Sequence, residues 1–180
     1  MAGANDYGTP FDIFQACERR WGKFDLDVCA HNLNAKCHSW YGEPGHPLAE
    51  GCTAYDGLAQ PWYSRNWLNP PYSAKGPNGK DIGVVGDWLM KAVKEVEKAK
   101  TTVAILKLDS STAWARIVAD HAAEVHFLLG SRIRFLETVQ IGGEWTQQSA
   151  GTPKFCALIA VFRPMYAGEQ QRKEWWDWQK

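Results

Sequence analysis

The sequence predicts an α/β fold in which a central, mostly parallel sheet carries helices on both faces. Amphipathic helical patterns alternate with short apolar runs through the middle of the chain. The run at 101–108 has a continuous apolar stretch, typical of a strand covered on both sides, and 124–129 and 154–162 are predicted as the strands that close the sheet. A chain of 180 residues has the length of one domain, so we expect a single domain over 1–180.

The first elements are predicted to be a helix and a strand. Residues 9–22, "TPFDIFQACERRWG", have a helical apolar stripe, with Thr9 as a possible cap and Pro10 suited to the first turn. Residues 23–30, "KFDLDVCA", predict a short strand. Residues 31–60 have weak periodicity and many turn-forming residues, so we expect mainly loops there.

The rest of the chain shows further alternation of strands and helices. Residues 65–71, "RNWLNPP", predict a second strand, and 74–86, rich in Gly and Lys, a mobile surface loop. Residues 87–100 form the clearest amphipathic pattern, with Asp87 as its cap. A second capped helix is expected over 110–122, and a terminal helix over the last twelve residues.

Composition excludes several classes of protein. Twenty basic and twenty acidic residues give a formal net charge of zero, so any contact with phosphates must come from a local patch. Five cysteines, an odd number, argue against a full disulfide framework and fit reduced thiols in a cytoplasm. No run approaches 18 apolar residues, and the first ten residues lack the pattern of a signal peptide.

The segment Asn69-Pro70-Pro71-Tyr72 predicts a site that grips an amino group on a planar ring. Such a nitrogen is a poor nucleophile because its lone pair is delocalised. The side-chain carbonyl of Asn69 and the backbone carbonyl of Pro70 can accept its two hydrogens, and proline aims that carbonyl in advance. Tyr72 offers a flat face for stacking. A plain turn is the alternative, but the strand before the segment and the helix and strand after it favour a site.

An amino group held in this way needs an electrophile, and a cofactor with a methylsulfonium is the obvious candidate. In open α/β sheets, ligands lie beyond the carboxyl ends of the strands. Asp27, near the end of the first predicted strand, is placed to bind a ribose hydroxyl. Asp56, on the connection before the second strand, is placed to bind the adenine amino group of the cofactor.

Five segments resemble, in order, the phage-type DNA N6-adenine methyltransferases: "FDLDVCAHNLNAKC", "DGLAQPW", "NWLNPPYS", "SSTAW" and "GSRIRF". The resemblance covers roughly residues 7–163. It implies a Rossmann-like class I methyltransferase fold, S-adenosylmethionine as cofactor and DNA as substrate. The N-terminal half must be abbreviated, because only 42 positions separate Asp27 from Asn69. No separate target-recognition domain is visible.

The resemblance also implies roles for particular residues. Asn69, Pro70 and Tyr72 would hold the target amino group. Phe135 would lie against the flipped base, with Trp145 and Phe155 as rivals for that role. Asp27 could end either the first strand or the ribose-binding strand. A cofactor pocket is implied at six positions: Thr9, Pro10, Asp27, Cys29, Ala30 and Asp56.

Cations and metal-ligating residues form two further groups of candidates. An enzyme that flips a base needs cations to hold phosphates, and five on predicted loops are candidates: Lys75, Lys80, Arg132, Arg134 and Lys154. Loop 74–86 could reach into a groove. Six residues invite a zinc hypothesis, but their spacing is irregular and lacks a Cys-x-x-Cys pair, so we predict no metal: Cys29, His31, Cys37, His38, His46 and Cys52.

Three functions fit the sequence. The first is methyl transfer to adenine N6 in DNA, with the base flipped out of the duplex. The second is amino-group methylation of cytosine N4, RNA or a protein glutamine. The third is an inactive nucleic-acid-binding module of the same fold. The intact four-residue motif favours an enzyme, and the first function is predicted, for a monomer or homodimer in the cytoplasm of a phage-infected or prophage-carrying bacterium.

Overall fold

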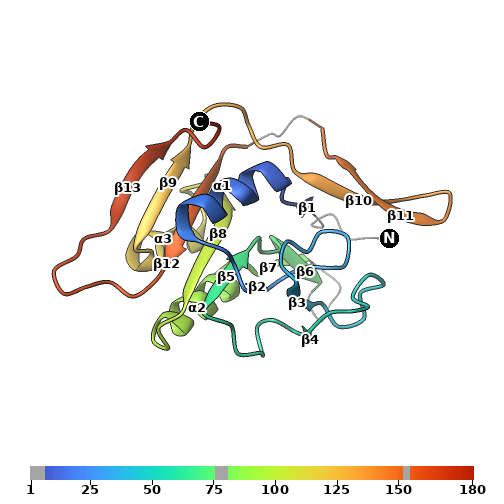
Figure 1. Ribbon diagram of the computed structural model, residues 1–180, viewed down its shortest axis with the longest axis horizontal. Helices are drawn as coiled ribbons and strands as arrows, with labels where there is room; N and C mark the ends of the chain where they lie inside the picture. Colours follow the sequence, from blue (N-terminus) through green and yellow to red (C-terminus); the bar gives the residue numbers. More distant parts are fainter. Residues whose placement is uncertain (1–6, 76–80, 152–154) are drawn as a thin grey trace.

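A sheet of eight strands forms the centre of the computed structural model, which describes residues 7–75, 81–151 and 155–180 (Figure 1). The order across the sheet is β4-β3-β2-β5-β8-β12-β9-β13. All neighbours are parallel except the two pairs made by β12, so the mostly parallel sheet is confirmed. The strands are β2 (Leu26–Asp27), β3 (Ser39–Gly42), β4 (Ala54–Tyr55), β5 (Arg65–Leu68), β8 (Thr101–Lys107), β9 (Glu124–Leu128), β12 (Ala157–Phe162) and β13 (Arg172–Trp176).

Helices cover both faces of the sheet, as expected. The helices are α1 (Phe11–Trp21), α2 (Val85–Val96) and α3 (Ala113–His121). On one face, Phe14 of α1 packs edge-on against Trp67 with ring centroids 5.2 Å apart. On the other face, Leu89 of α2 and Val118 of α3 share a buried cluster with Leu68. Trp67 and Leu68 are consecutive, so their side chains point to opposite faces of β5 and each contributes to one of the two buried clusters.

Two helix starts differ from the expected caps. Pro10, not Thr9, is the N-cap of α1, and no side chain caps that helix; Thr9 is instead buried at 2% exposure. Helix α2 begins at Val85, so Asp87 lies in its first turn rather than before it. A carboxylate in the first turn still interacts favourably with the positive end of the helix dipole.

The N-terminal half of the sheet is abbreviated, as the short spacing between Asp27 and Asn69 predicts. Residues 28–64, all of which are described, contain no helix, and the segment expected to be mainly loop supplies β3 and β4. Direct packing replaces the missing helices. A Cβ added at Gly57 would lie 2.1 Å from the carbonyl oxygen of Val28, so only glycine fits this buried turn.

Two expectations about the remaining segments are wrong. The last twelve residues do not form a helix, because Arg172–Trp176 pairs in parallel with β9 as the edge strand β13. Consecutive tryptophans suit a strand, where Trp176 packs against Trp21 on one side and Trp175 against Phe127 on the other. The segment 74–86 is not only loop, since β6 (Ser73–Lys75) and β7 (Asp81–Gly83) form an antiparallel pair.

A second small sheet stands apart from the main one. It has the order β1-β10-β11, with β1 (Tyr7–Gly8), β10 (Leu136–Ile141) and β11 (Glu144–Ser149). Strands β10 and β11 pair over six positions. In Figure 1 they extend as a two-stranded ribbon away from the main sheet. The sequence analysis assigned no element to this segment.

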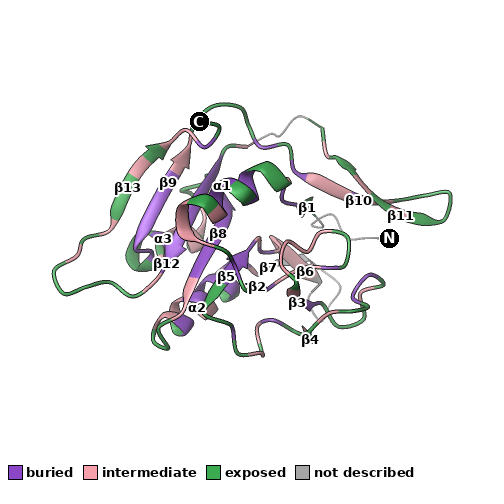
Figure 2. Ribbon diagram, in the orientation of Figure 1, coloured by how far each residue is buried: buried purple, intermediate pink, exposed green. Residues whose placement is uncertain are grey.

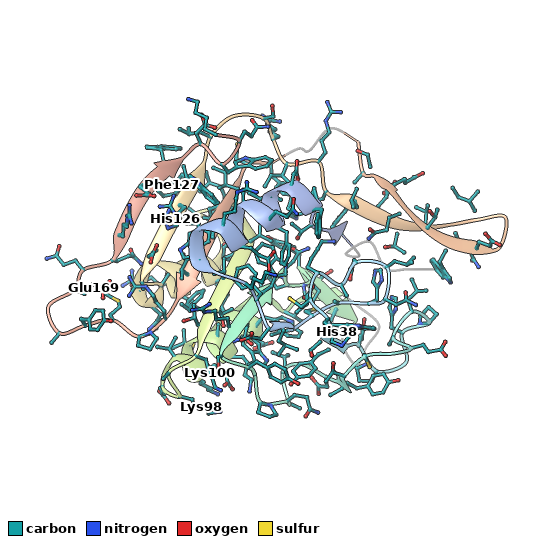
Figure 3. The ribbon with its side chains drawn as sticks, in the orientation of Figure 1. His38, Lys98, Lys100, His126, Phe127 and Glu169 are labelled. Atoms are coloured by element: carbon teal, nitrogen blue, oxygen red, sulfur yellow. The ribbon has the colours of Figure 1, made fainter. Side chains whose placement is uncertain are left out.

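A buried ionic network ties β9 to β12 and β13. His126, fully buried on β9 beside α1 (Figure 3), has a carboxylate oxygen 3.0 Å from each ring nitrogen, from Glu124 and Glu174. Arg163 donates to the other oxygen of Glu124 at 3.0 Å. The hydrogen bonds from His126, then Arg163 and Trp21, outweigh burial and lower the pKa of Glu124 from 4.5 to about 2.

This network predicts an acid-sensitive contribution to stability. Because the folded pKa of Glu124 lies below its ordinary value, the contribution is complete above pH 4.5 and is lost as the pH falls toward 2. We expect Glu124→Gln to lower the free energy of unfolding by roughly 1–3 kcal/mol at neutral pH and by progressively less in acid. Urea unfolding from pH 3 to pH 7 checks this, with the exposed Glu50→Gln as control. A cost for Glu124→Gln that did not shrink in acid would contradict it.

Candidate active site

Strands β2 and β5 lie side by side at the point where the connections of the sheet change direction. The chain runs from β2 outward to β3 and β4 on one side, and from β5 outward to β8 on the other. At such a switch point, the carboxyl ends of the strands leave a crevice for ligands. The register pairs Asp27 with Trp67, so Asp27 and Asn69, just beyond β5, lie at the same edge.

The first pocket at this edge, here named the Asp27 pocket, contains Asp27 and Asn69 together. Three of the residues predicted for a cofactor, Thr9, Asp27 and Cys29, contribute to its lining. Its lining residues are Gly8, Thr9, Asp27, Cys29, Asn34, Lys36, Trp67 and Asn69. The β2–β5 pairing thus brings the predicted cofactor residues to the amino-gripping motif.

The carboxyl group of Asp27 is buried, with 3% of the residue exposed. It accepts backbone hydrogen bonds from Lys36 at 3.0 Å and from Cys29 at 3.4 Å. Burial nevertheless dominates and raises the pKa of Asp27 from 3.8 to about 7. A carboxylate with so little solvation gains strongly from a cationic or hydroxylic ligand.

Two further groups in the Asp27 pocket suit a charged ligand. The hydroxyl of Thr9 is buried and has no hydrogen-bond partner within the described part of the chain. Lys36 extends its ammonium to the backbone oxygen of Asn34 at 3.0 Å, and burial lowers its pKa. The pocket therefore presents an acid, a base and an unsatisfied hydroxyl, which match the ammonium and carboxylate of an amino acid.

A hydrogen bond to β1 orients the side chain of Asn69. Its amide nitrogen donates to the backbone oxygen of Tyr7 at 2.5 Å. The amide oxygen therefore points the other way and is left to accept, as the predicted role requires. Asn69 lines both pockets at this edge.

A second pocket, here named the Tyr72 pocket, adjoins the first through Asn69. Its lining residues are Tyr7, Asn69, Pro70, Tyr72, Lys107, Phe135 and Phe155. Four aromatic rings in one small pocket are suited to holding a flat ring. Phe135 and Phe155 both line it, with ring centroids 5.8 Å apart, whereas Trp145 is on the ribbon outside it.

Lys107 is a further residue of this pocket, at the carboxyl end of β8. Its backbone N–H donates to the hydroxyl of Tyr72 at 2.6 Å, which anchors the tyrosine ring, and burial raises the pKa of Tyr72. Its ammonium lies 4.0 Å from the ring centroid of Tyr72 and 4.8 Å from that of Phe155. A base entering between these rings must displace the ammonium. The position at the carboxyl end of β8 was the available signal.

The other predicted cofactor residues lie near the Asp27 pocket but outside its lining. Pro10 caps α1, and Ala30 donates its backbone N–H to Tyr41. Asp56 follows β4 directly, with positive φ, and is exposed at the same edge of the sheet. Pro71 lines neither pocket.

The strand order resolves which strand Asp27 ends. It ends β2, the first and central strand of the parallel set, and β3 is its neighbour. The residue just beyond β3 is Glu43, which is exposed. An acidic residue at the end of the second strand is the usual partner of a ribose hydroxyl in related folds. Glu43 therefore occupies the position that such a ribose ligand takes, and the sequence analysis did not single it out.

The structure describes the side chains of two of the five predicted phosphate-binding cations. Arg132 and Arg134 are exposed on the segment between β9 and β10, which leads into Phe135. Lys80 and Lys154 lie outside the described residues, as does the side chain of Lys75. Within residues 7–75, 81–151 and 155–180, no group of three or more Cys, His, Asp or Glu side chains could hold a metal ion. No helix in the same ranges is long and apolar enough to cross a bilayer.

Comparisons with known proteins identify the family of the chain. The family model "DNA N-6-adenine-methyltransferase (Dam)" matches residues 3–173. A DNA N-6-adenine-methyltransferase of Escherichia phage T1 is 30% identical over 178 residues, covering 92% of this chain and 66% of the T1 protein. The DNA N-6-adenine-methyltransferase of Haemophilus phage HP1 is 30% identical over 161 residues, covering 88% of this chain and 78% of its own.

The fold agrees as well. A crystal structure from Listeria monocytogenes, described as a class I S-adenosylmethionine-dependent methyltransferase, superposes with a TM-score of 0.56 at 10% identity, over 100% of this chain and 69% of that one. This likeness confirms the Rossmann-like class I fold. The family match spans both pockets, from Thr9 through Asn69 to Phe155. By sequence, fold and the arrangement of its motif, the chain belongs to the DNA N-6-adenine-methyltransferase (Dam) family.

Proposed function

We propose that this chain transfers a methyl group from S-adenosylmethionine to the N6 amino group of adenine in DNA. The observation that carries the proposal is the position of Asn69. This residue lines both pockets, and its amide N–H donates to the backbone oxygen of Tyr7. One pocket suits a charged amino acid and the other a flat aromatic ring. The family membership supports both assignments.

The Asp27 pocket fits the amino-acid part of the cofactor. The carboxylate of Asp27 would pair with its ammonium, the ammonium of Lys36 with its carboxylate, and the unpartnered hydroxyl of Thr9 would complete the polar contacts. Glu43 and Asp56, beyond β3 and β4, would hold the ribose hydroxyls and the adenine amino group. When bound, the cofactor supplies an electrophilic methyl group on a sulfonium.

The target amino group would be held by two acceptors. The amide oxygen of Asn69 and the backbone oxygen of Pro70 each accept one N–H, and Pro70 is buried, so its carbonyl is fixed. Tyr72, anchored through its hydroxyl, and Phe135 or Phe155 would stack on the ring. Acceptors that hold both hydrogens favour a more tetrahedral nitrogen with its lone pair available for attack, so a strong base is not required.

The aromatic lining implies that the base leaves the duplex. Both faces of the adenine must be exposed before aromatic rings can contact them, and inside a duplex these faces are covered by neighbouring bases. Arg132 and Arg134 would hold phosphates beside the pocket mouth. We expect the enzyme to act as a monomer or homodimer in the cytoplasm of a phage-infected or prophage-carrying bacterium, and the single-domain organisation remains a prediction.

Removing the amide of Asn69 tests the proposed grip. Asn69→Ala is expected to lower kcat about 100-fold or more, because one fixed polar partner of the reacting group is lost. Cofactor affinity, measured by calorimetry, should change much less, since several other groups line the Asp27 pocket. The readout is transfer of labelled methyl groups to adenine-containing DNA. Turnover equal to the unmodified protein would contradict the assignment.

The buried carboxyl of Asp27 predicts opposite effects of pH on stability and on cofactor binding. Its folded pKa is raised to about 7, so its contribution to stability is complete below pH 3.8 and is lost as the pH rises through about 7. Asp27→Asn removes this titration, so the variant should gain stability relative to the unmodified protein between pH 4 and pH 8. Thermal unfolding of the ligand-free proteins measures the difference.

In the unmodified protein, the affinity for the cofactor should increase with pH, whereas the stability decreases. The affinity should rise as the pH increases through about 7, since the ionised carboxylate pairs with the ammonium of the cofactor. Asp27→Asn should weaken binding at least tenfold at pH 8 and flatten its pH dependence. Calorimetric titration with S-adenosylmethionine at pH 6 and pH 8 makes the comparison. A pH-independent affinity of the unmodified protein would refute the role of this carboxyl group.

A further inference from the structure

The β10–β11 ribbon presents one free face, and its geometry is fixed by its turn. Ile141 pairs with Glu144, leaving a two-residue loop of Gly142 and Gly143, both with positive φ. A type I′ hairpin turn needs such angles at both central positions. An isolated two-stranded ribbon is only marginally stable in water. Figure 2 shows its outer half largely in the colour of exposed residues, so little of this chain covers it.

The inner end of the ribbon is anchored to both pockets through β1. Tyr7 of β1 pairs with Glu137 and lines the Tyr72 pocket, whereas Gly8 pairs with Leu136 and lines the Asp27 pocket. Directly paired residues point to the same face of a sheet, and successive residues to opposite faces. The ribbon face that carries Glu137 therefore continues the wall of the Tyr72 pocket.

At its inner end, the opposite face of the ribbon is turned to the protein body. Thr138, next to Glu137 along the strand, is buried, and its hydroxyl lies 3.1 Å from the Nε2 of His31. Gln147, its partner on β11, has its amide nitrogen close to Gly8. These contacts leave the pocket-side face as the one available to a substrate lying across the pocket mouth.

The pocket-side face carries side chains that can read base edges. Its six members are Glu137, Val139, Ile141, Glu144, Thr146 and Gln148. Glutamine can bind adenine through its N6 and N7 atoms, glutamate can accept from cytosine N4, and apolar groups can contact the thymine methyl group. Gln148 is exposed, and its amide donates to Glu137 at 2.8 Å. Ile141, at the tip, is 60% exposed.

We propose that this ribbon is the target-recognition element, and that its pocket-side face reads base pairs in the major groove of duplex DNA next to the flipped adenine. A two-stranded ribbon fits the major groove, and six pairs span about 20 Å at roughly 3.3 Å per residue. The inference rests on the proposed function and deepens it.

Charge separates the tasks of reading and positioning. Residues 135–149 contain no Lys or Arg but two Glu, so the ribbon gains nothing from phosphates. Arg132 and Arg134, exposed on the segment that leads into β10, are placed for that task. Phosphate contacts position a protein on DNA, whereas base contacts specify the sequence. Because its glutamates repel phosphates, the ribbon would bind DNA poorly at sequences where it makes no contacts with base edges.

Two glutamines on opposite faces of the ribbon provide a matched test. The pocket-side variant is Thr146→Ala/Gln148→Ala. The control is Gln140→Ala, which removes an exposed amide on the other face that donates to the turn carbonyl of Gly143 at 2.9 Å. The preferred sequence of the unmodified protein is first found by mapping methylated adenines in mixed-sequence DNA. Then kcat/KM is measured on the preferred duplex, on duplexes with one flanking base pair changed, and on a single-stranded oligonucleotide.

The pocket-side variant is expected to lose at least tenfold of its discrimination between these duplexes, because base-edge contacts carry about that factor or more. Its cofactor affinity and single-strand methylation should stay within about twofold, and Gln140→Ala should behave like the unmodified protein. Unchanged discrimination in the pocket-side variant would overturn the inference, as would an equal loss in the control.

Two other outcomes also decide against it. A dimer that the pocket-side variant abolishes in size-exclusion chromatography, with discrimination kept, would assign the ribbon to self-association. No adenine methylation by the unmodified protein on any DNA would overturn the proposed function first, and this inference with it.

Discussion

The parallel pairing of β2 with β5 is the constraint on which the rest of the site depends. Asp27 is level with Trp67, and the backbone N–H of Val28 donates to the carbonyl of Trp67 at 3.1 Å. A shift of one residue would turn Asp27 to the other face of the sheet. Trp67 prevents such a shift, because it is fully buried against Phe14 and Phe24. Hydrophobic packing of Trp67 thus fixes the position of Asp27 relative to Asn69 at this edge of the sheet.

That alignment has a cost in stability. Asp27 and Lys36 lie in one pocket, and burial disfavours the charged form of each, so the ligand-free protein holds two poorly solvated groups close together. The hydroxyl of Thr9 adds an unsatisfied dipole. Each of these groups would be satisfied by an amino-acid zwitterion, so stability given up in the empty pocket is regained as binding free energy. The Glu124–His126–Arg163 network is the converse, because both carboxylate oxygens of Glu124 have hydrogen-bond partners within the protein.

Strong local signals made much of the fold predictable. Helix α2 and strand β8 have long, regular patterns, and the Asn69–Tyr72 motif needs only its own residues to be recognised. Strands β2, β3 and β4 are two to four residues long and owe their existence to pairing with neighbours, so local periodicity could not show most of them. Strand β13 was mistaken for a helix, because a charged and aromatic segment fits either structure until a sheet edge is available.

The ribbon was missed for a different reason. The Gly142–Gly143 pair between alternating residues is a hairpin signal that the sequence does contain. Lys107 and Glu43 belong to no local motif, and what singles each of them out is its position at a strand end next to other strand ends. Local chemistry is therefore readable one residue at a time, whereas the membership of a pocket depends on the order of the strands.

The two-residue strand β1 connects the ribbon to Asn69 and to the Asp27 pocket. Tyr7 pairs with Glu137 on the ribbon, and its carbonyl oxygen accepts the hydrogen bond that orients the amide of Asn69. Gly8 pairs with Leu136 and lines the Asp27 pocket. Under the proposed function, one backbone pairing would therefore link the position of the ribbon on DNA to Asn69 and to the wall of the Asp27 pocket. Correct seating of the ribbon and correct orientation of Asn69 become one structural condition.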